Sequence, residues 1–282
     1  MTDRKPLLTE LRIPEFGVAQ LEQVVTEIAV EYTTGSVAEL AITISDAKFA
    51  VTKAAGALIG STVLFEGTSW QVGSVEAEMA EWGAQLVVRC RDPLAKKLRR
   101  TYRTSAEKNV SPGQWVTGRV KAAGGRSVVQ ASSKRGTIAQ SKNDSVLDII
   151  DSLAGDLEWA WTSFDGTFLF ASRFAAWQGK VPGRSTWPVT WQASAVTDAL
   201  TAGWADSDDN SDNRAELDIE LRYESGRRIR PWDRLQCSIP GASGLWLVED
   251  VSITHDGITP VAIKAAKPKP PSPKAGSSSK ES

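Results

Sequence analysis

Residues 70–93 read WQVGSVEAEMAEWGAQLVVRCRDP, and residues 246–268 read WLVEDVSITHDGITPVAIKAAKP. In each stretch, valines follow the tryptophan by two and five residues, and a turn, a second alternating segment and a proline come next. Alternating apolar residues on both sides of a glycine-containing turn are typical of a β-hairpin. The sequence therefore predicts two copies of one hairpin, each closing a β-rich module.

Other alternating segments precede each hairpin. Residues 28–32, 40–44 and 62–65 come before the first copy, and residues 215–223 come before the second. In each segment, apolar residues occupy every other position, which is the period of a half-buried strand. Short strands at this spacing predict a small barrel or sandwich. We therefore expect a mainly β chain in which two similar tube-like β-barrels flank a different, central segment.

The central segment has the pattern of a small α/β insert. Asp92-Pro93 and Ser111-Pro112 each combine a capping residue with a first-turn proline, and so predict helix starts. Residues 145–153 carry apolar residues at helical spacing. A hairpin is predicted around Asp165-Gly166, with Trp159 and Trp161 on its first strand.

Charge is segregated along the chain, although the net charge is only −1. Residues 1–88 contain 5 Lys/Arg and 12 Asp/Glu, residues 89–142 contain 14 and 2, and residues 143–282 contain 14 and 20. A basic middle between two acidic blocks suggests a distinct neighbour for the middle. The basic residues proposed to make contacts follow Asp92-Pro93; they are Lys96, Lys97, Arg99, Arg100 and Arg103. They could meet nucleic-acid phosphate or an acidic protein surface, or form a solvated or subunit-contacting helix.

Composition restricts the class of protein further. The chain has 282 residues, 41% of them hydrophobic, which is enough to bury a sizeable core. No run approaches the roughly 18 apolar residues of a membrane span, and the N-terminus lacks a secretion signal. We therefore expect a soluble protein made in a cytoplasm, without a membrane anchor. Cys90 and Cys237 lie on alternating segments and are predicted to be buried thiols.

No catalytic, metal or cofactor site is predicted. Asp206–Asp212 begins like a calcium loop, but Ser211 replaces the required glycine, so a solvated acidic loop is expected. His255, the single histidine, is predicted to lie exposed in a hairpin turn. One histidine and two buried thiols cannot form the usual zinc sets, and no Gly-x-Ser-x-Gly or phosphate-binding glycine loop is present.

The order of these features resembles that of the hub proteins of bacteriophage tails and related contractile injection machines, including the late-control protein family. The segments that carry the resemblance are ELAITISD (39–46), GSTVLFEGTSWQVGSV (60–75), VRCRDP (88–93), DSVLDIIDSLA (144–154), FDGTFLF (164–170), RPWDRL (230–235) and GLWLVEDV (244–251). The resemblance covers about residues 25–266. It implies an N-terminal arm (1–22), a first β-barrel module (23–104), a small α/β insert (105–178), a second β-barrel module (179–266) and a flexible Pro/Lys/Ser-rich tail (267–282).

The resemblance also implies a function. Such a hub is a homotrimer whose six barrels form a pseudo-sixfold ring at the end of the tail tube, located in the virion and assembled in the host cytoplasm. Its expected partners are the distal tail or tail tube protein, the C-terminal end of the tape-measure protein and tip or spike proteins, with DNA passing through the ring. It would not be an enzyme. Two alternatives remain at this point: a carbohydrate-binding β-module that stacks Trp159 and Trp161 on cell-wall glycans, and a cell-wall hydrolase.

Overall fold

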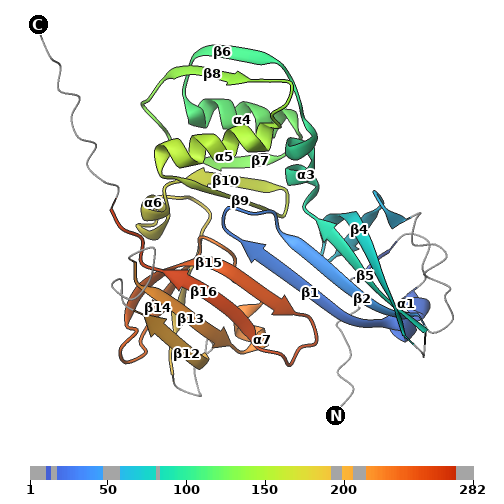
Figure 1. Ribbon diagram of the computed structural model, residues 1–282. Helices are drawn as coiled ribbons and strands as arrows, with labels where there is room; N and C mark the ends of the chain where they lie inside the picture. Colours follow the sequence, from blue (N-terminus) through green and yellow to red (C-terminus); the bar gives the residue numbers. More distant parts are fainter. Residues whose placement is uncertain are drawn as a thin grey trace, which may run out of the picture.

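The computed structural model describes residues 11–13, 18–46, 58–80, 83–191, 199–205 and 214–270. Within them the chain is mainly β, as predicted, with one large sheet and a small α/β unit above it (Figure 1). The acidic segment 206–213 and residues 271–282 of the expected tail lie outside the described residues. None of the described helices combines the length and apolar character needed to span a bilayer.

The first module is an antiparallel sheet with the strand order β1–β2–β5–β4–β3. Its elements are α1 (Val18–Val24), β1 (Val25–Thr33), β2 (Glu39–Asp46), β3 (Thr62–Phe65), β4 (Thr68–Ala80) and β5 (Gly83–Arg91). Arg12, from the segment expected to be an arm, forms a bridge to Leu64 beside β3, and its neighbours Leu11 and Ile13 are buried. These described N-terminal residues therefore contribute to the core of the first module.

The second module repeats this order as β12–β13–β16–β15–β14, again antiparallel throughout. Its elements are β11 (Thr186–Val189), β12 (Ala199–Ala205), β13 (Glu216–Leu221), α7 (Tyr223–Gly226), β14 (Arg234–Cys237), β15 (Gly244–Thr254) and β16 (Val261–Ala266). Only β11, which runs parallel to β14, has no strand counterpart among the described residues of the first module.

The two modules also share their irregularities. Trp70 in β4 and Trp246 in β15 are both 2% exposed. Three residues after each tryptophan, the register of the hairpin shifts at a bulge, which leaves Gly73 unpaired in one module and Glu249 unpaired in the other. Bulges are specific features of a strand rather than random defects. Their shared positions confirm that the two hairpins are copies of one unit.

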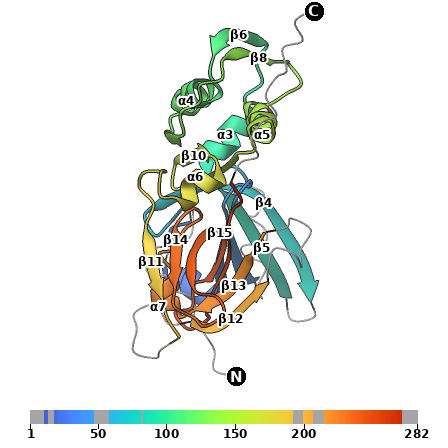
Figure 2. The ribbon, with the colours of Figure 1, turned by 90° about the vertical axis from the view of Figure 1, so that its left-hand side faces the viewer.

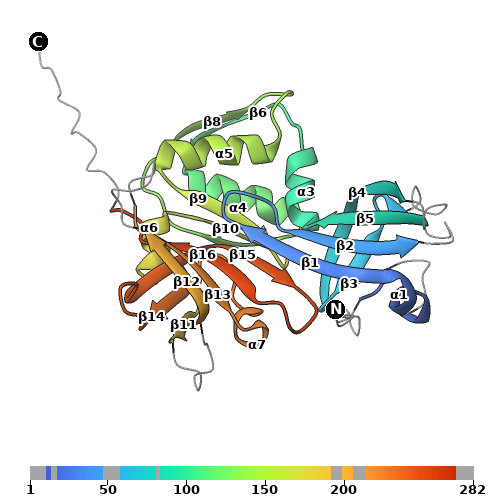
Figure 3. The ribbon, with the colours of Figure 1, turned by 60° about the horizontal axis from the view of Figure 1, so that its bottom comes forward.

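The modules are not two separate closed barrels, because β15 is long enough to serve both. On one edge it pairs with β16. On the other edge its first half pairs with β14, and its second half pairs with β1 from Ala29↔Thr254 to Thr33↔Asp250. We call this β1–β15 pairing the in-chain seam. It joins the strands of the two modules into one continuous curved sheet, seen from the side in Figure 2 and tilted forward in Figure 3. No closed barrel is formed within the described part of the chain.

The α/β insert has its own core above the sheet (Figure 1). Its elements are α3 (Pro93–Arg100), β6 (Ser105–Val110), α4 (Pro112–Ala122), β7 (Arg126–Val129), β8 (Gly136–Gln140), α5 (Val146–Leu157), β9 (Ala160–Phe164), β10 (Thr167–Ala171) and α6 (Arg173–Trp177). The predicted caps are present: Asp92 accepts hydrogen bonds from the backbone of Leu94 and Ala95, and Ser111 forms a capping box. Leu94 and Leu98 of α3 pack into the insert core.

The two insert tryptophans are packed into this core. Trp161 is 2% exposed, and its ring stacks on Phe168 with 5.4 Å between ring centroids. Trp159 packs edge-on against Phe170 at 5.2 Å. Trp161 is therefore a core residue, whereas Trp159 is half-buried and packs against the same core. Both cysteines are buried and free, as predicted, and burial raises the pKa of Cys237 to about 11.

His255 is buried at the junction of the modules, and the expectation of an exposed turn histidine is wrong. It is 1% exposed, and its Nδ1 lies 3.1 Å from the Tyr223 hydroxyl and 3.5 Å from Glu66 Oε1. The in-chain seam explains the burial, because the backbone N–H of His255 donates to Ile28 of β1 at 2.8 Å. Burial, helped by nearby Arg230 and Arg227, lowers the pKa of His255 to about 4.

This depressed pKa predicts acid sensitivity of the junction. The unfolded chain takes up the His255 proton near pH 6.5 and the folded chain near pH 4, so falling pH removes stability within this window. The loss amounts to about 3 kcal/mol. Because the chain has one histidine, an NMR titration of its imidazole measures the value without mutagenesis. A titration midpoint near 4 is expected, and a midpoint near 6.5 would contradict the buried junction.

Candidate interaction surfaces

One face of the continuous sheet is polar from β12 to β4. Residues directly opposite one another in neighbouring strands point to the same side of a sheet. The registers therefore place nine acidic and three basic side chains on this face, which we call the acidic sheet face. The acids are Glu27, Glu31, Glu39, Glu76, Glu78, Glu216, Asp218, Glu220 and Asp250, and the bases are Arg89, Arg91 and Lys264.

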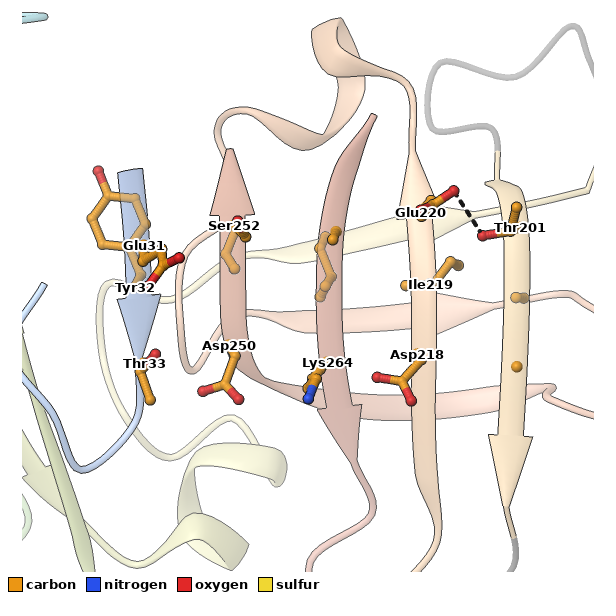
Figure 4. A pocket seen from close by; sticks show the side chains of 15 residues that line it. Glu31, Tyr32, Thr33, Thr201, Asp218, Ile219, Glu220, Asp250, Ser252 and Lys264 are labelled. Carbon is orange, nitrogen blue, oxygen red and sulfur yellow. Dashed lines mark hydrogen bonds between the residues drawn. The ribbon is translucent and has the colours of Figure 1, made fainter. Parts of the chain in front are cut away.

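The acidic sheet face is hollowed where five strands, from β12 to β1, meet in a depression of about 610 Å³ (Figure 4). Lys264 lies between Asp250 and Asp218, its register partners on either side. On the other module, Arg89 pairs with Glu39 at 2.8 Å and with Glu76 at 3.2 Å. These three bases neutralise part of the acidic charge, and the face remains net negative.

An excess of one sign of charge on a sheet face is costly, because like charges on neighbouring strands repel. Glu31 lies directly opposite Glu39 on β2, and Glu216, Asp218 and Glu220 occupy alternate positions of β13. Such a surface repels polyanions and does not adsorb them.

The predicted basic residues lie on α3 and just after it, and α3 divides them between two hollows. Lys96, Lys97, Arg100 and Arg103 line a groove of about 610 Å³ between α3 and α4. Arg99 lies in a smaller hollow of about 200 Å³, which it shares with Lys96 and Arg100. We call this second site the basic hollow; Gly73, Arg91, Val37 and Ala95 complete its lining.

Sequence reasoning missed two contributors to these hollows. Arg119 enters the larger groove from α4, and Arg91 enters the basic hollow from β5. Lys96 belongs to both hollows; its ammonium donates to the Val72 carbonyl at 3.2 Å, and burial together with Arg100 and Arg91 lowers its pKa. A nearby carboxylate would stabilise the charged form of such a lysine.

The described residues contain no cluster of three or more His, Cys, Asp or Glu side chains arranged to hold a metal ion. The hydroxyl beside His255 belongs to Tyr223, and both side chains are buried. Two charged regions of opposite sign, the acidic sheet face and the basic side of α3, are the candidate interaction surfaces.

No family model matches the sequence, and no curated protein matches it. Solved structures do match the fold. One is c3393, a component of the type VI secretion system of E. coli, which is described as structurally similar to the T4 tail proteins gp27 and gp5. Its TM-score is 0.61 at 14% identity, and the match covers 93% of this chain and 77% of that one. A tail protein of Neisseria meningitidis MC58 gives 0.60 at 11% identity, covering 86% and 91%.

The 43 kDa tail protein of prophage MuSo2 from Shewanella oneidensis gives a TM-score of 0.58 at 9% identity, covering 85% of this chain and 92% of that one. In all three cases the match covers at least 85% of this chain. At these identities the comparison concerns the fold. The chain therefore has the fold of phage tail proteins and of a type VI secretion component, as the resemblance in its sequence implied.

Proposed function

We propose that this protein is a non-catalytic structural hub of a phage tail tip or baseplate, in which three copies form a pseudo-sixfold ring. The observation that carries the proposal is the in-chain seam between two copies of one module. It joins module to module within the chain, so the same pairing can join one chain to the next. The fold that this chain shares with tail proteins supports its placement in a phage tail.

The sheet has free edges where this pairing would be repeated. No described strand pairs with the outer side of β12, although at its first residue the Ala199 N–H donates to the Thr190 carbonyl at 3.0 Å. β3 pairs only with residues 68–71 of β4, so the edge of β4 from Ser74 onward has no partner strand among the described residues. Unpaired edges of this kind are templates for another chain. They carry exposed apolar side chains: Leu200 is 45%, Trp204 48% and Met79 66% exposed.

Irregularities at the same place in β1 and β12 define which residues would meet. The register shifts just before Glu27 in β1 and just before Thr201 in β12, so these two residues correspond. Three residues further on, Trp204 corresponds to Val30. By the same reasoning, Ala77 in β4 corresponds to Ile253 in β15. Val30 and Ile253 face each other in the in-chain seam and are 2% and 1% exposed. Pairing of Trp204 with Ala77 of the next copy would bury the equivalent positions.

A head-to-tail contact of this type closes into a ring when its rotation permits. Three chains with two modules each supply six similar units, which allows a threefold particle to meet a sixfold tube. The acidic sheet face would then line the opening, where its negative charge lets DNA pass without adsorbing. Partners in this role are the distal tail or tube protein, the end of the tape-measure protein and tip or spike proteins.

Replacing Trp204 with glutamate should prevent ring formation, because the seam would bury an unpaired charge. Mass photometry of the wild type is expected to show a species of three times the 30.4 kDa chain mass, and W204E a monomer. Ile258→Glu is the matched control, since Ile258 is 62% exposed in the β15–β16 turn, away from both edges. A wild-type protein that stays monomeric and never enters tails would contradict the proposal.

The register is tested by a cysteine pair, A77C with W204C. Directly opposite Cα atoms in antiparallel strands lie about 4.5–5.5 Å apart, which suits a disulfide. Mild oxidation should therefore give a covalent trimer on a non-reducing gel. The control V75C with W204C shifts the pair by two residues, to about 7–8 Å, and should remain unlinked. Rings that form but link only in the control would overturn the assigned register.

A further inference from the structure

Two oppositely charged features remain without a role in the ring as described. The first is the segment 206–213, DSDDNSDN, which contains four aspartates and connects β12 to β13. The second is the basic hollow beneath α3. Lys96, Arg99 and Arg100 form no ion pair with a described acidic residue, and the lining of the hollow contains no acid.

The in-chain seam gives a template for what meets this hollow. At that seam, the connection from β1 to β2 lies against the bulge of β15. The backbone N–H and the hydroxyl of Thr34 both donate to the Glu249 carbonyl, at 3.0 and 2.9 Å. The side chain of the bulge residue is itself neutralised, because Glu249 pairs with Arg214 at 2.7 Å and with Arg173 at 3.2 Å.

At the seam between two copies, the corresponding elements are the β12–β13 connection of one copy and the bulge of β4 in the next. Two differences distinguish this seam from the in-chain seam. The connection between strands spans residues 206–215 instead of 34–38. The bulge residue is Gly73 instead of Glu249, so no carboxylate from the bulge reaches the surrounding bases. The hollow beside Gly73 thus has free volume, and although Arg91 pairs with Glu39 at 3.7 Å, its other three bases, Lys96, Arg99 and Arg100, form no ion pair with a described acid.

We propose that the acidic segment 206–213 of one copy occupies the basic hollow of the next copy and locks the seam between them. This inference rests on the proposed ring. The chemistry is charge-assisted hydrogen bonding of aspartate carboxylates to the guanidinium groups of Arg99 and Arg100 and to the ammonium of Lys96. Two observations support this contact: acidic and basic residues are segregated along the sequence, and Gly73 has no side chain to fill the hollow.

The location of Lys96 agrees with this assignment. Its pKa is lowered by burial and by the neighbouring Arg100 and Arg91, so its ammonium is short of negative charge in the isolated chain. A carboxylate from the next copy would supply that charge. The interaction would also give the ring a salt dependence, since ion pairs near a surface are screened by added salt.

Charge reversal tests the inference in the full-length chain. D208K/D209K and, separately, R99E/R100E should each raise the concentration at which half of the rings dissociate by about tenfold or more, because like charges then face each other. The chain that carries all four changes should recover assembly, because every seam again has opposite charges. D156K/E158K, which changes two exposed acids at the end of α5, is the control and should assemble like the wild type.

The result also separates this inference from the proposed function. If the wild type forms rings and D208K/D209K and R99E/R100E form rings of the same stability, the proposed ring is supported. The proposed contact between segment 206–213 and the basic hollow is then wrong. If both variants weaken the ring but the combined chain does not recover, the two groups do not meet, and the assignment is overturned. Zero-length carbodiimide cross-linking of Lys96 to an aspartate of 206–213, between isotope-labelled and unlabelled copies, is expected in wild-type rings.

Discussion

The antiparallel pairing of β1 with β15 is the contact on which the rest of the structure depends. It joins two copies of one five-stranded unit into a continuous sheet, and it buries Val30, Ile253 and His255 at their junction. A chain with two such units has one seam inside it and two matching edges outside it. The architecture thereby constrains assembly, because edges with the same geometry as the seam favour the same pairing.

Much of this architecture could be predicted from the sequence because it depends on local periodicity. The spacing from Trp70 and Trp246 to their valines identified the duplicated hairpin, and the Ser111-Pro112 helix start was present where expected. Separate barrels were expected, yet the modules are open and share a sheet. The reason is that pairing between β1 and β15, more than 200 residues apart, leaves no mark on local patterning.

The functional surfaces were harder to predict for the same reason. The basic run containing Lys96 and Arg99 was visible in the sequence, but Arg91 and Arg119 join those hollows only through folding. The acidic sheet face gathers between one and three charged residues from each of several strands, so it could be recognised only once the strands were placed side by side. His255 looked exposed because it precedes a turn, but strand β1 and the rings of Phe65 and Tyr223, all distant in sequence, pack around it.

The two modules and their charges give one physical account of a ring. In the proposed ring, equivalent seams would hold the units together, the acidic sheet face would border the opening, and opposite charges would meet where one copy contacts the next. Electron cryo-microscopy of the purified particle tests this account most directly. The account predicts threefold symmetry with near-sixfold density, and β4 hydrogen-bonded to β12 of the neighbouring copy. A particle with another symmetry, or with β4 and β12 both facing solvent, would contradict it.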